Sequence, residues 1–243
     1  MKNILNKFSL AFILVLCLSF NCICSVSNAK EPEEVSKENN IIYLTFDDGP
    51  SVMTNKVLDV LMKNDVKATF FIIGNQIEDQ ENVLVRIKNE GHSMGLHTYT
   101  HDFKKIYSSN KAFINEMKLT QEYIKKVTGI SPNIIRFPGG SRNHLDTKTL
   151  NLLHSYNFKI YDWNVDSQDG INPKTSPSKL FRKATKSDVN SEPIILLMHC
   201  DYMHENTYKA LDKIIKFYKD SGYEFRVIDE NTPEHYFPLN KNK

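Results

Sequence analysis

Carboxylate, imidazole and guanidinium side chains recur in five short segments of this 243-residue chain, each at or just after the end of an apolar run. Such groups hold metal ions and transfer protons in active sites. A carboxylate with two imidazoles suits Zn²⁺, Co²⁺, Ni²⁺ or Fe²⁺, and three protein ligands leave positions open for water and substrate. The five segments contain Asp47 and Asp48, His97 and His101, Arg136, Asp166 and Asp169, and His199.

The remaining groups in these segments would complete a hydrolytic site. A second carboxylate beside the metal ligand is within reach of the water, whose pKa a bound metal lowers towards neutrality. A histidine on the opposite side can protonate a leaving amine. If the fold brings the segments together, they predict metal-assisted hydrolysis of an amide or an ester.

Each segment taken alone also has an ordinary structural explanation. The Asp47–Pro50 stretch has the composition of a tight turn, and the two histidines of the second segment could lie on the surface. Arg136 could pair with a carboxylate in a loop, and His199 could be a core histidine. We interpret Cys200 as a small buried apolar side chain. The other histidines fit no such pattern and are interpreted as structural: His92, His144, His154, His204 and His235.

Apolar, β-branched or aromatic runs alternate with amphipathic segments of helical period from Ile41 onward. The predicted strands are Ile41–Phe46, Ala68–Ile73, Ser93–Leu96, Ile134–Arg136, Lys159–Asn164, Ile194–Met198 and Glu224–Val227. The predicted helices are Asn55–Lys63, Val83–Lys88, Ala112–Val127, Thr147–Ser155, Pro177–Lys186 and Asn206–Lys219. This alternation indicates an α/β fold with a mostly parallel sheet, either a closed (β/α) barrel or an open doubly wound sheet. In both architectures the carboxyl ends of the strands form the functional face, so we expect the five polar segments to converge there.

Residues 1–29 have the layout of a secretory signal peptide. Two lysines and no acidic residue accompany an apolar run at Leu10–Phe20, and Ser27-Asn28-Ala29 supplies small residues for cleavage. The run is short for a membrane span, which needs roughly 20 apolar residues. We therefore expect a secreted or cell-wall-associated protein without a stable membrane span, and retention of the segment as a membrane tether is the alternative.

Cleavage after Ala29 would change the composition of the chain. Three of the four cysteines would leave, so the mature protein would keep Cys200 and could form no internal disulfide. Losing two lysines from 31 basic residues leaves 29 against 29 acidic residues, a balance that argues against a nucleic-acid partner bound by bulk charge. The charged stretch 30–40 is interpreted as a linker and 41–243 as one catalytic domain, which we expect to be monomeric.

Five motifs, in family order, resemble those of the polysaccharide deacetylases with a NodB-type domain, carbohydrate esterase family 4. The resemblance spans Ile41 to about Val227. The motifs are Thr45–Pro50 (TFDDGP), His97–His101 (HTYTH), Arg136–Gly140 (RFPGG), Asp166–Asp169 (DSQD) and Leu197–His199 (LMH). The resemblance implies a distorted (β/α) barrel of about seven parallel strands.

The resemblance also implies a role for each polar residue of the motifs. Asp48, His97 and His101 would hold a divalent metal, with zinc expected first and cobalt or nickel as alternatives. Asp47 would be the general base that activates the water, and His199 would be the general acid for the leaving nitrogen.

Supporting roles and two departures follow from the same resemblance. Arg136 would orient Asp47, Asp169 would hydrogen-bond His199, and the Gly139 N–H would stabilise the oxyanion. The family usually has Trp where this chain has Gly170, and often Tyr where it has Gly139. Both departures remove bulk, so we expect a more open cleft.

The substrate implied by the resemblance is an amino-sugar polymer that loses N-acetyl groups. An exported protein rich in Lys, Asn and Ile fits a low-GC Gram-positive bacterium, which favours N-acetylglucosamine of peptidoglycan over N-acetylmuramic acid, chitooligosaccharides and O-acetyl xylan, in that order. Phe137, Tyr161 and Trp163 are candidates for sugar stacking, and each could equally be a core residue. Gly170 motivates a second hypothesis, a non-catalytic glycan-binding module. A two-histidine, one-carboxylate Fe(II) oxygenase is a third, disfavoured by the adjacent aspartates and the export signal.

Overall fold

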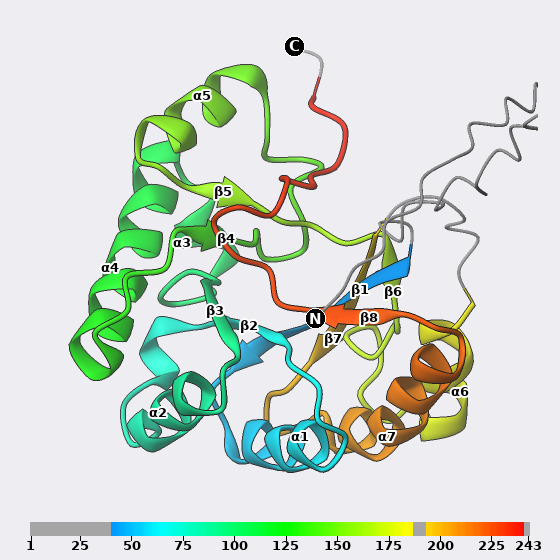
Figure 1. Ribbon diagram of the computed structural model, residues 1–243. Helices are drawn as coiled ribbons and strands as arrows, with labels where there is room; N and C mark the ends of the chain where they lie inside the picture. Colours follow the sequence, from blue (N-terminus) through cyan, green and yellow to red (C-terminus); the bar gives the residue numbers. More distant parts are fainter. Residues whose placement is uncertain (1–39, 187–192, 241–243) are drawn as a thin grey trace, which may run out of the picture. The chain divides into compact units, whose positions relative to one another are not determined.

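Parallel strands form one curved sheet in the described part of the chain, residues 40–186 and 193–240 of this computed structural model (Figure 1). The strands are β1 (Ile41–Gly49), β2 (Thr69–Ile72), β3 (Ser93–Leu96), β4 (Ile134–Ile135), β5 (Lys159–Ile160), β6 (Val165–Asp166), β7 (Ile194–His199) and β8 (Glu224–Arg226). Seven of them follow the order β5-β4-β3-β2-β1-β7-β6, and β8 pairs with the first residues of β1. The α/β prediction is confirmed, and the distorted barrel takes the form of a curled half-barrel.

One predicted strand is wrong. The run 159–164 forms a strand only at its start, as β5, and the chain re-enters the sheet directly after the run, as β6, at the opposite edge. The backbone between β5 and β6 makes other hydrogen bonds. The Asp162 N–H donates to His235 O at 2.6 Å, and the Arg136 guanidinium donates to the carbonyl oxygens of Tyr161 and Asp162. Tyr161 forms only an isolated parallel bridge, with His235, and β5 and β6 are not paired with each other, so the barrel stays open between them.

Helices surround the sheet on its outer side, as Figure 1 shows. They are α1 (Val52–Lys63), α2 (Glu81–Asn89), α3 (Phe103–Ile106), α4 (Asn110–Thr128), α5 (Thr147–Ser155), α6 (Pro177–Ala184) and α7 (Glu205–Asp220), with a 3₁₀ turn η2 at Gly74–Gln76. The six predicted helices are confirmed, whereas α3 and η2 are too short to show a period in the sequence. Ser51 caps α1 through a capping box, and Gly129, with a φ of 76°, ends α4.

Buried strands at the centre of the sheet hold the site rigidly. Nearly every residue of β1 and β7 is buried, as expected for parallel strands covered on both faces. Leu58 and Leu61 of α1 are fully buried against this core, and burying each such side chain contributes about 1.5–3 kcal/mol. Cys200, directly after β7, is a buried free cysteine, as predicted. No helix in the described ranges has the length and apolar character to cross a membrane.

Candidate active site

A cleft of about 480 Å³ opens at the carboxyl ends of the strands. Seven of the residues predicted for the site line this cleft: Asp47, Asp48, His97, His101, Gly139, Trp163 and His199. Arg136 and Asp169 lie beneath this surface and are fully buried. The five polar segments therefore converge, as expected from the parallel topology.

The end of β1 presents two consecutive carboxylates to the cleft. Successive side chains of a regular strand point to opposite faces, so Asp47 and Asp48 could not both do this from an undistorted strand. The register with β2 shifts between Phe46 and Gly49, and Asp48 has a φ of 66°. This irregularity turns both side chains into the cleft, at a backbone conformation that aspartate tolerates better than most residues.

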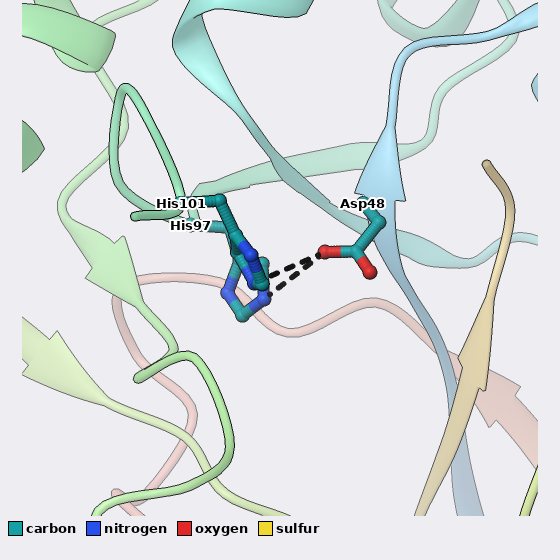
Figure 2. Close-up of side chains that lie close together, drawn as sticks. All are labelled: Asp48, His97 and His101. Carbon is teal, nitrogen blue, oxygen red and sulfur yellow. Dashed lines mark ion pairs between the residues drawn. The ribbon is translucent and has the colours of Figure 1, made fainter. Parts of the chain in front are cut away.

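Asp48, His97 and His101 form a cluster suited to a divalent metal (Figure 2). Asp48 Oδ1 lies 3.4 Å from Nε2 of each histidine and has no hydrogen-bond partner among the residues that the structure describes. Two ligands at about 2.1 Å from a tetrahedral zinc lie about 3.4 Å apart, so the spacing fits a shared ion. The residues present therefore fit the metal that the sequence predicted.

Two further contacts prepare the histidines for a metal. His97 Nδ1 lies 3.0 Å from Arg136 O, and since a carbonyl only accepts, Nδ1 carries a proton and Nε2, which lies beside Asp48, is the nitrogen that can ligate a metal. Burial, followed by the nearby His97, lowers the pKa of His101, which favours the neutral, ligating form.

A tight turn after β3 brings His101 back beside His97. Thr98 and His101 have φ angles of 68° and 53°, and the two histidine rings are 5.1 Å apart between centroids. Glu116 of α4 fastens the turn, because its Oε2 accepts the N–H groups of Tyr99 and Thr100 at 3.0 and 2.7 Å. The sequence pattern missed Glu116, since nothing in a helical period marks one carboxylate as reaching a distant loop.

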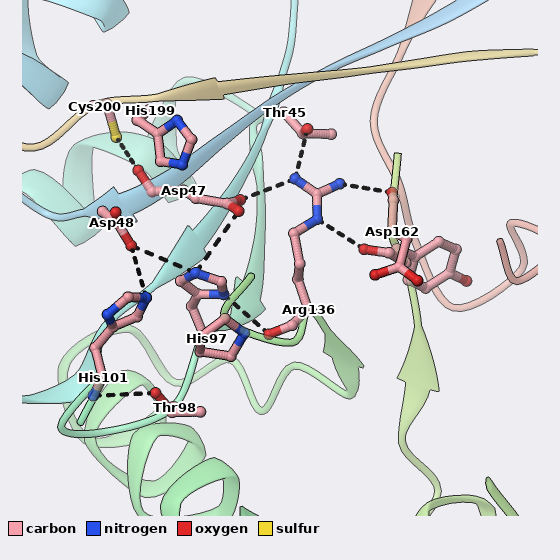
Figure 3. A network of polar contacts seen from close by, with 12 residues as sticks. Thr45, Asp47, Asp48, His97, Thr98, His101, Arg136, Asp162, His199 and Cys200 are labelled. Carbon is pink, nitrogen blue, oxygen red and sulfur yellow. Dashed lines mark hydrogen bonds and ion pairs between the residues drawn. The ribbon is translucent and has the colours of Figure 1, made fainter. Parts of the chain in front are cut away.

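Arg136 holds Asp47, the carboxylate that is not part of the metal cluster, in position (Figure 3). Its Nη1 donates to Asp47 Oδ1 at 2.9 Å and to Thr45 Oγ1 at 2.7 Å. Its other nitrogens donate to backbone carbonyls, and the guanidinium lies 4.1 Å from the ring centroid of Phe71. Because every part of the guanidinium is engaged, Asp47 is held in one orientation with Oδ2 left towards His97, 3.7 Å away.

His199 and Asp169 form a buried ion pair on the other side of the cleft. His199 Nδ1 lies 2.8 Å from Asp169 Oδ1, and Asp169 Oδ2 accepts the Thr207 hydroxyl at 2.7 Å. Burial opposes both charges, but the hydrogen bond and charge of Asp169 raise the pKa of His199 to about 10. The same bond lowers the pKa of Asp169 to about 2. His199 is therefore protonated at neutral pH, with Nε2–H free to donate.

These pKa shifts predict how stability depends on pH. The pair stabilises the fold fully between about pH 4 and pH 6.5; the His199 share is lost as pH rises from 6.5 to about 10, and the Asp169 share as pH falls from 3.8 to about 2. We expect the melting-temperature gap between wild type and Asp169→Asn to be widest near pH 5–6 and to narrow towards pH 10. Thermal melts across this range test it.

The surface pair of His154 and Glu234 supplies a matched control. Its side chains are 42% and 21% exposed, so solvent screens the interaction, and Glu234→Gln should produce no comparable pH-dependent gap. A gap for Asp169→Asn that stays constant between pH 6.5 and 10 would contradict the assignment of a charged His199.

Comparison with known proteins identifies the family. The sequence profile described as polysaccharide deacetylase matches residues 34–161. The chain belongs to the polysaccharide deacetylase family. This deacetylase is 35% identical over 207 residues to a peptidoglycan-N-acetylglucosamine deacetylase of Bacillus cereus, across 84% of this chain and 74% of the relative. It is 32% identical over 211 residues to a chitin deacetylase of Colletotrichum lindemuthianum, across 81% of this chain and 82% of that protein.

A solved structure shares the fold of the deacetylase. The catalytic domain of a peptidoglycan N-acetylglucosamine deacetylase from Eubacterium rectale superposes with a TM-score of 0.75 at 32% identity. The match covers 84% of this chain and 94% of that domain. The similarity therefore extends over nearly the whole of a catalytic domain in this family.

The residues predicted for substrate contact separate into two groups. Gly139 and Trp163 line the cleft of the deacetylase. Phe137 does not: it is 1% exposed and stacks on Phe113 with ring centroids 4.3 Å apart. Tyr161 is also fully buried. Of the two roles left open for Phe137 and Tyr161, the structure therefore supports the core role, and the prediction that Phe137 contacts substrate is wrong because its buried ring cannot stack on a sugar.

Two of the glycines named from the resemblance lie directly against aromatic rings of the cleft. A Cβ on Gly170 would lie 2.6 Å from His199 Cε1, so the His199 ring fills the space of a side chain there. A Cβ on Gly139 would lie 3.3 Å from Cε1 of Phe103, which is 48% exposed at the cleft wall. The rings of His199 and Phe103 therefore limit the side chain that either glycine position can accept.

Several cleft residues of the deacetylase carried no signal in the sequence. Phe103, Ile171 and Met203 are exposed apolar side chains on the cleft wall, and neither loops nor a four-residue helix such as α3 shows a periodicity in the sequence. His204, interpreted from the sequence as structural, also lines the cleft. His199 and His204 lie at the same wall of the cleft because of the conformation of the loop between them, which the sequence does not reveal.

Proposed function

We propose that this protein is a metal-dependent amide hydrolase that removes N-acetyl groups from amino-sugar polymers, with N-acetylglucosamine of peptidoglycan as its substrate. One observation carries the proposal: Asp47 and the protonated His199 line the same cleft as the Asp48–His97–His101 cluster. A base, an acid and a metal site around one space are what amide hydrolysis requires. The names of the relatives from Bacillus cereus and Eubacterium rectale support the choice of polymer.

Asp48, His97 and His101 would hold the metal, zinc first and cobalt or nickel as alternatives. A bound divalent cation supplies Lewis acidity, which polarises the acetyl carbonyl and makes water acidic enough to attack near neutral pH. The nitrogen-rich ligand set favours zinc, cobalt or nickel over magnesium or calcium, which prefer oxygen.

Asp47 would act as the general base. Arg136 occupies Oδ1, so the proton of the attacking water would pass to Oδ2 while the water oxygen bonds to the acetyl carbon. The resulting oxyanion would accept from the Gly139 N–H, which has no hydrogen bond within the described ranges and lies at the cleft wall.

His199 would complete the reaction as general acid. Its Nε2–H would pass a proton to the sugar nitrogen as the bond between that nitrogen and the acetyl carbon breaks, giving acetate and a free amino sugar. The Asp169 carboxylate keeps the ring charged before the transfer and stabilises the correct tautomer.

Chelation is expected to remove the activity. The mature protein should release acetate from fully N-acetylated peptidoglycan strands, lose that activity in EDTA, and recover it with Zn²⁺ or Co²⁺. The reason is that the three ligand side chains cannot polarise the acetyl carbonyl without the metal. Mass spectrometry of the glycan, which resolves the mass lost with each acetyl group, measures the release. Undiminished acetate release after removal of the metal would contradict the proposal.

The same assay separates the alternative substrates and functions. Chitooligosaccharides are supported by the chitin deacetylase among the relatives, and acetyl xylan is an ester that needs less help from a general acid. Faster acetate release from either than from peptidoglycan would change the substrate assignment. Glycan binding without any acetate release at high protein concentration would favour the non-catalytic module.

We also propose that residues 1–29 direct export and that the chain acts outside the cell as a single catalytic domain from 41 to 243. A glycan of the cell wall is a substrate that only an exported enzyme meets in bulk. The composition of the segment supports this reading, through its basic start, apolar run and small residues before the cleavage point.

A further inference from the structure

We propose that His204, held by Asp201, binds a hydroxyl group of the sugar polymer and positions the substrate beside His199. The inference rests on the proposed function and extends it to a residue for which neither the motifs nor the comparisons supply a role. Four observations carry it: the anchoring of one ring nitrogen, the isolation of the other, the place of the ring in the cleft, and its contact with His199.

Asp201 anchors one ring nitrogen of His204. Asp201 Oδ1 lies 2.9 Å from His204 Nδ1 and also accepts the Met203 N–H at 2.7 Å. Burial alone would raise the pKa of Asp201. The hydrogen bond and charge of His204, together with the Met203 N–H, outweigh burial and lower the pKa of this carboxyl. Asp201 is therefore an acceptor, Nδ1 carries the proton, and the ring is fixed with Nε2 on the opposite edge.

The other ring nitrogen has no protein partner. His204 is 4% exposed, and its Nε2 is buried with no hydrogen bond to any residue of the described ranges. A buried polar atom left unpaired costs free energy, so native structures almost always supply a partner. Since His204 lines the cleft, we infer that the partner of Nε2 is a group of the substrate bound there.

The ring lies next to the proposed general acid. The His199 and His204 rings stack with centroids 5.1 Å apart and an interplanar angle of 24°. A substrate nitrogen that reaches His199 therefore brings the adjoining part of the sugar to His204. A hydroxyl can both donate and accept, so it matches Nε2 in the neutral and in the charged ring. Sugar hydroxyls are abundant in this polymer class.

A second metal site is a weaker explanation of the same cluster. Asp169, His199 and His204 bring ligand atoms within 4.8 Å of one another. Both Asp169 oxygens already accept hydrogen bonds, from His199 and Gly170 at Oδ1 and from Thr207 and the His199 N–H at Oδ2. A protonated His199 would also repel a cation, so the cluster favours a neutral polar ligand.

Two substitutions separate substrate binding from loop structure. In His204→Asn the amide N–H₂ can still donate to Asp201, but nothing reaches the position of Nε2; His204→Gln places an amide there and loses the anchor. We expect KM for chitotetraose to rise about tenfold in the asparagine variant, the size of one lost hydrogen bond, with kcat within about twofold. The glutamine variant should recover part of the loss.

Binding without turnover completes the test. Trp163 is the single tryptophan and lines the cleft, so its fluorescence can follow chitotetraose binding in an Asp47→Asn background. Adding His204→Asn should weaken binding about tenfold, and an unchanged affinity would overturn the inference even if wild type releases acetate. A wild type that binds chitotetraose but releases acetate neither from it nor from peptidoglycan would overturn the proposed function alone. A second equivalent of zinc bound by wild type and lost in His204→Asn would also overturn the inference, in favour of a metal site.

Discussion

The Asp47→Asn variant is expected to bind metal and glycan normally and to release acetate about 10²–10⁴-fold more slowly, the usual contribution of a general base. Asparagine can still accept from Arg136 through its carbonyl oxygen, so the buried guanidinium keeps its partner and the fold should survive. What disappears is the proton acceptor at the position of Oδ2. Steady-state acetate release, metal content and a thermal melt together measure the effect.

Its neighbour offers a matched comparison. Asp48→Asn weakens a ligand whose Oδ1 faces both histidines, so this variant should lose metal, whereas Asp47→Asn should keep it. Asp220→Asn, at an exposed pair with Lys216, should leave both properties unchanged. If Asp47→Asn kept its kcat within about threefold, or lost metal as Asp48→Asn does, the division of roles between the two carboxylates would be wrong.

The second large effect is expected from Gly170→Ala. Gly170 has no positive φ, so its backbone accepts alanine, but the new Cβ would lie 2.6 Å from His199 Cε1. The new Cβ is fixed by the backbone of residue 170, whereas the His199 ring can rotate. The ring must therefore move away from the position in which it bonds Asp169. A displacement of about 1 Å at a catalytic group can lower the rate about 10²-fold, and we expect a loss of kcat of that size.

A double-mutant cycle shows whether this loss acts through the His199 ring. In a His199→Ala background the ring is gone, and Gly170→Ala should lower the residual rate no further. An equal loss in both backgrounds would mean that alanine disturbs the loop itself. Wild-type kcat in Gly170→Ala would show that His199 can act from a shifted position, and thermal melts of all four proteins would exclude simple unfolding.

Much of the fold was accessible from the sequence because parallel strands and their helices have strong local patterns. Ser93–Leu96 and Thr147–Ser155 were predicted with the bounds that β3 and α5 have. The convergence of the polar segments followed from topology, since parallel strands bring their carboxyl ends to one edge. The run 159–164 was predicted as one strand because apolar content reveals a tendency to extend, and not the partner that takes each backbone hydrogen bond.

The amino-acid sequence by itself determined which groups could do chemistry: two adjacent carboxylates, a pair of histidines four residues apart, and a histidine at the end of a buried strand. Only the tertiary structure decided which side chains meet the substrate. It buried Phe137, left Trp163 at the cleft wall, and placed His204 against His199. The physical reason is that exposure and side-chain direction depend on packing between segments far apart in the chain, which local residue patterns do not encode.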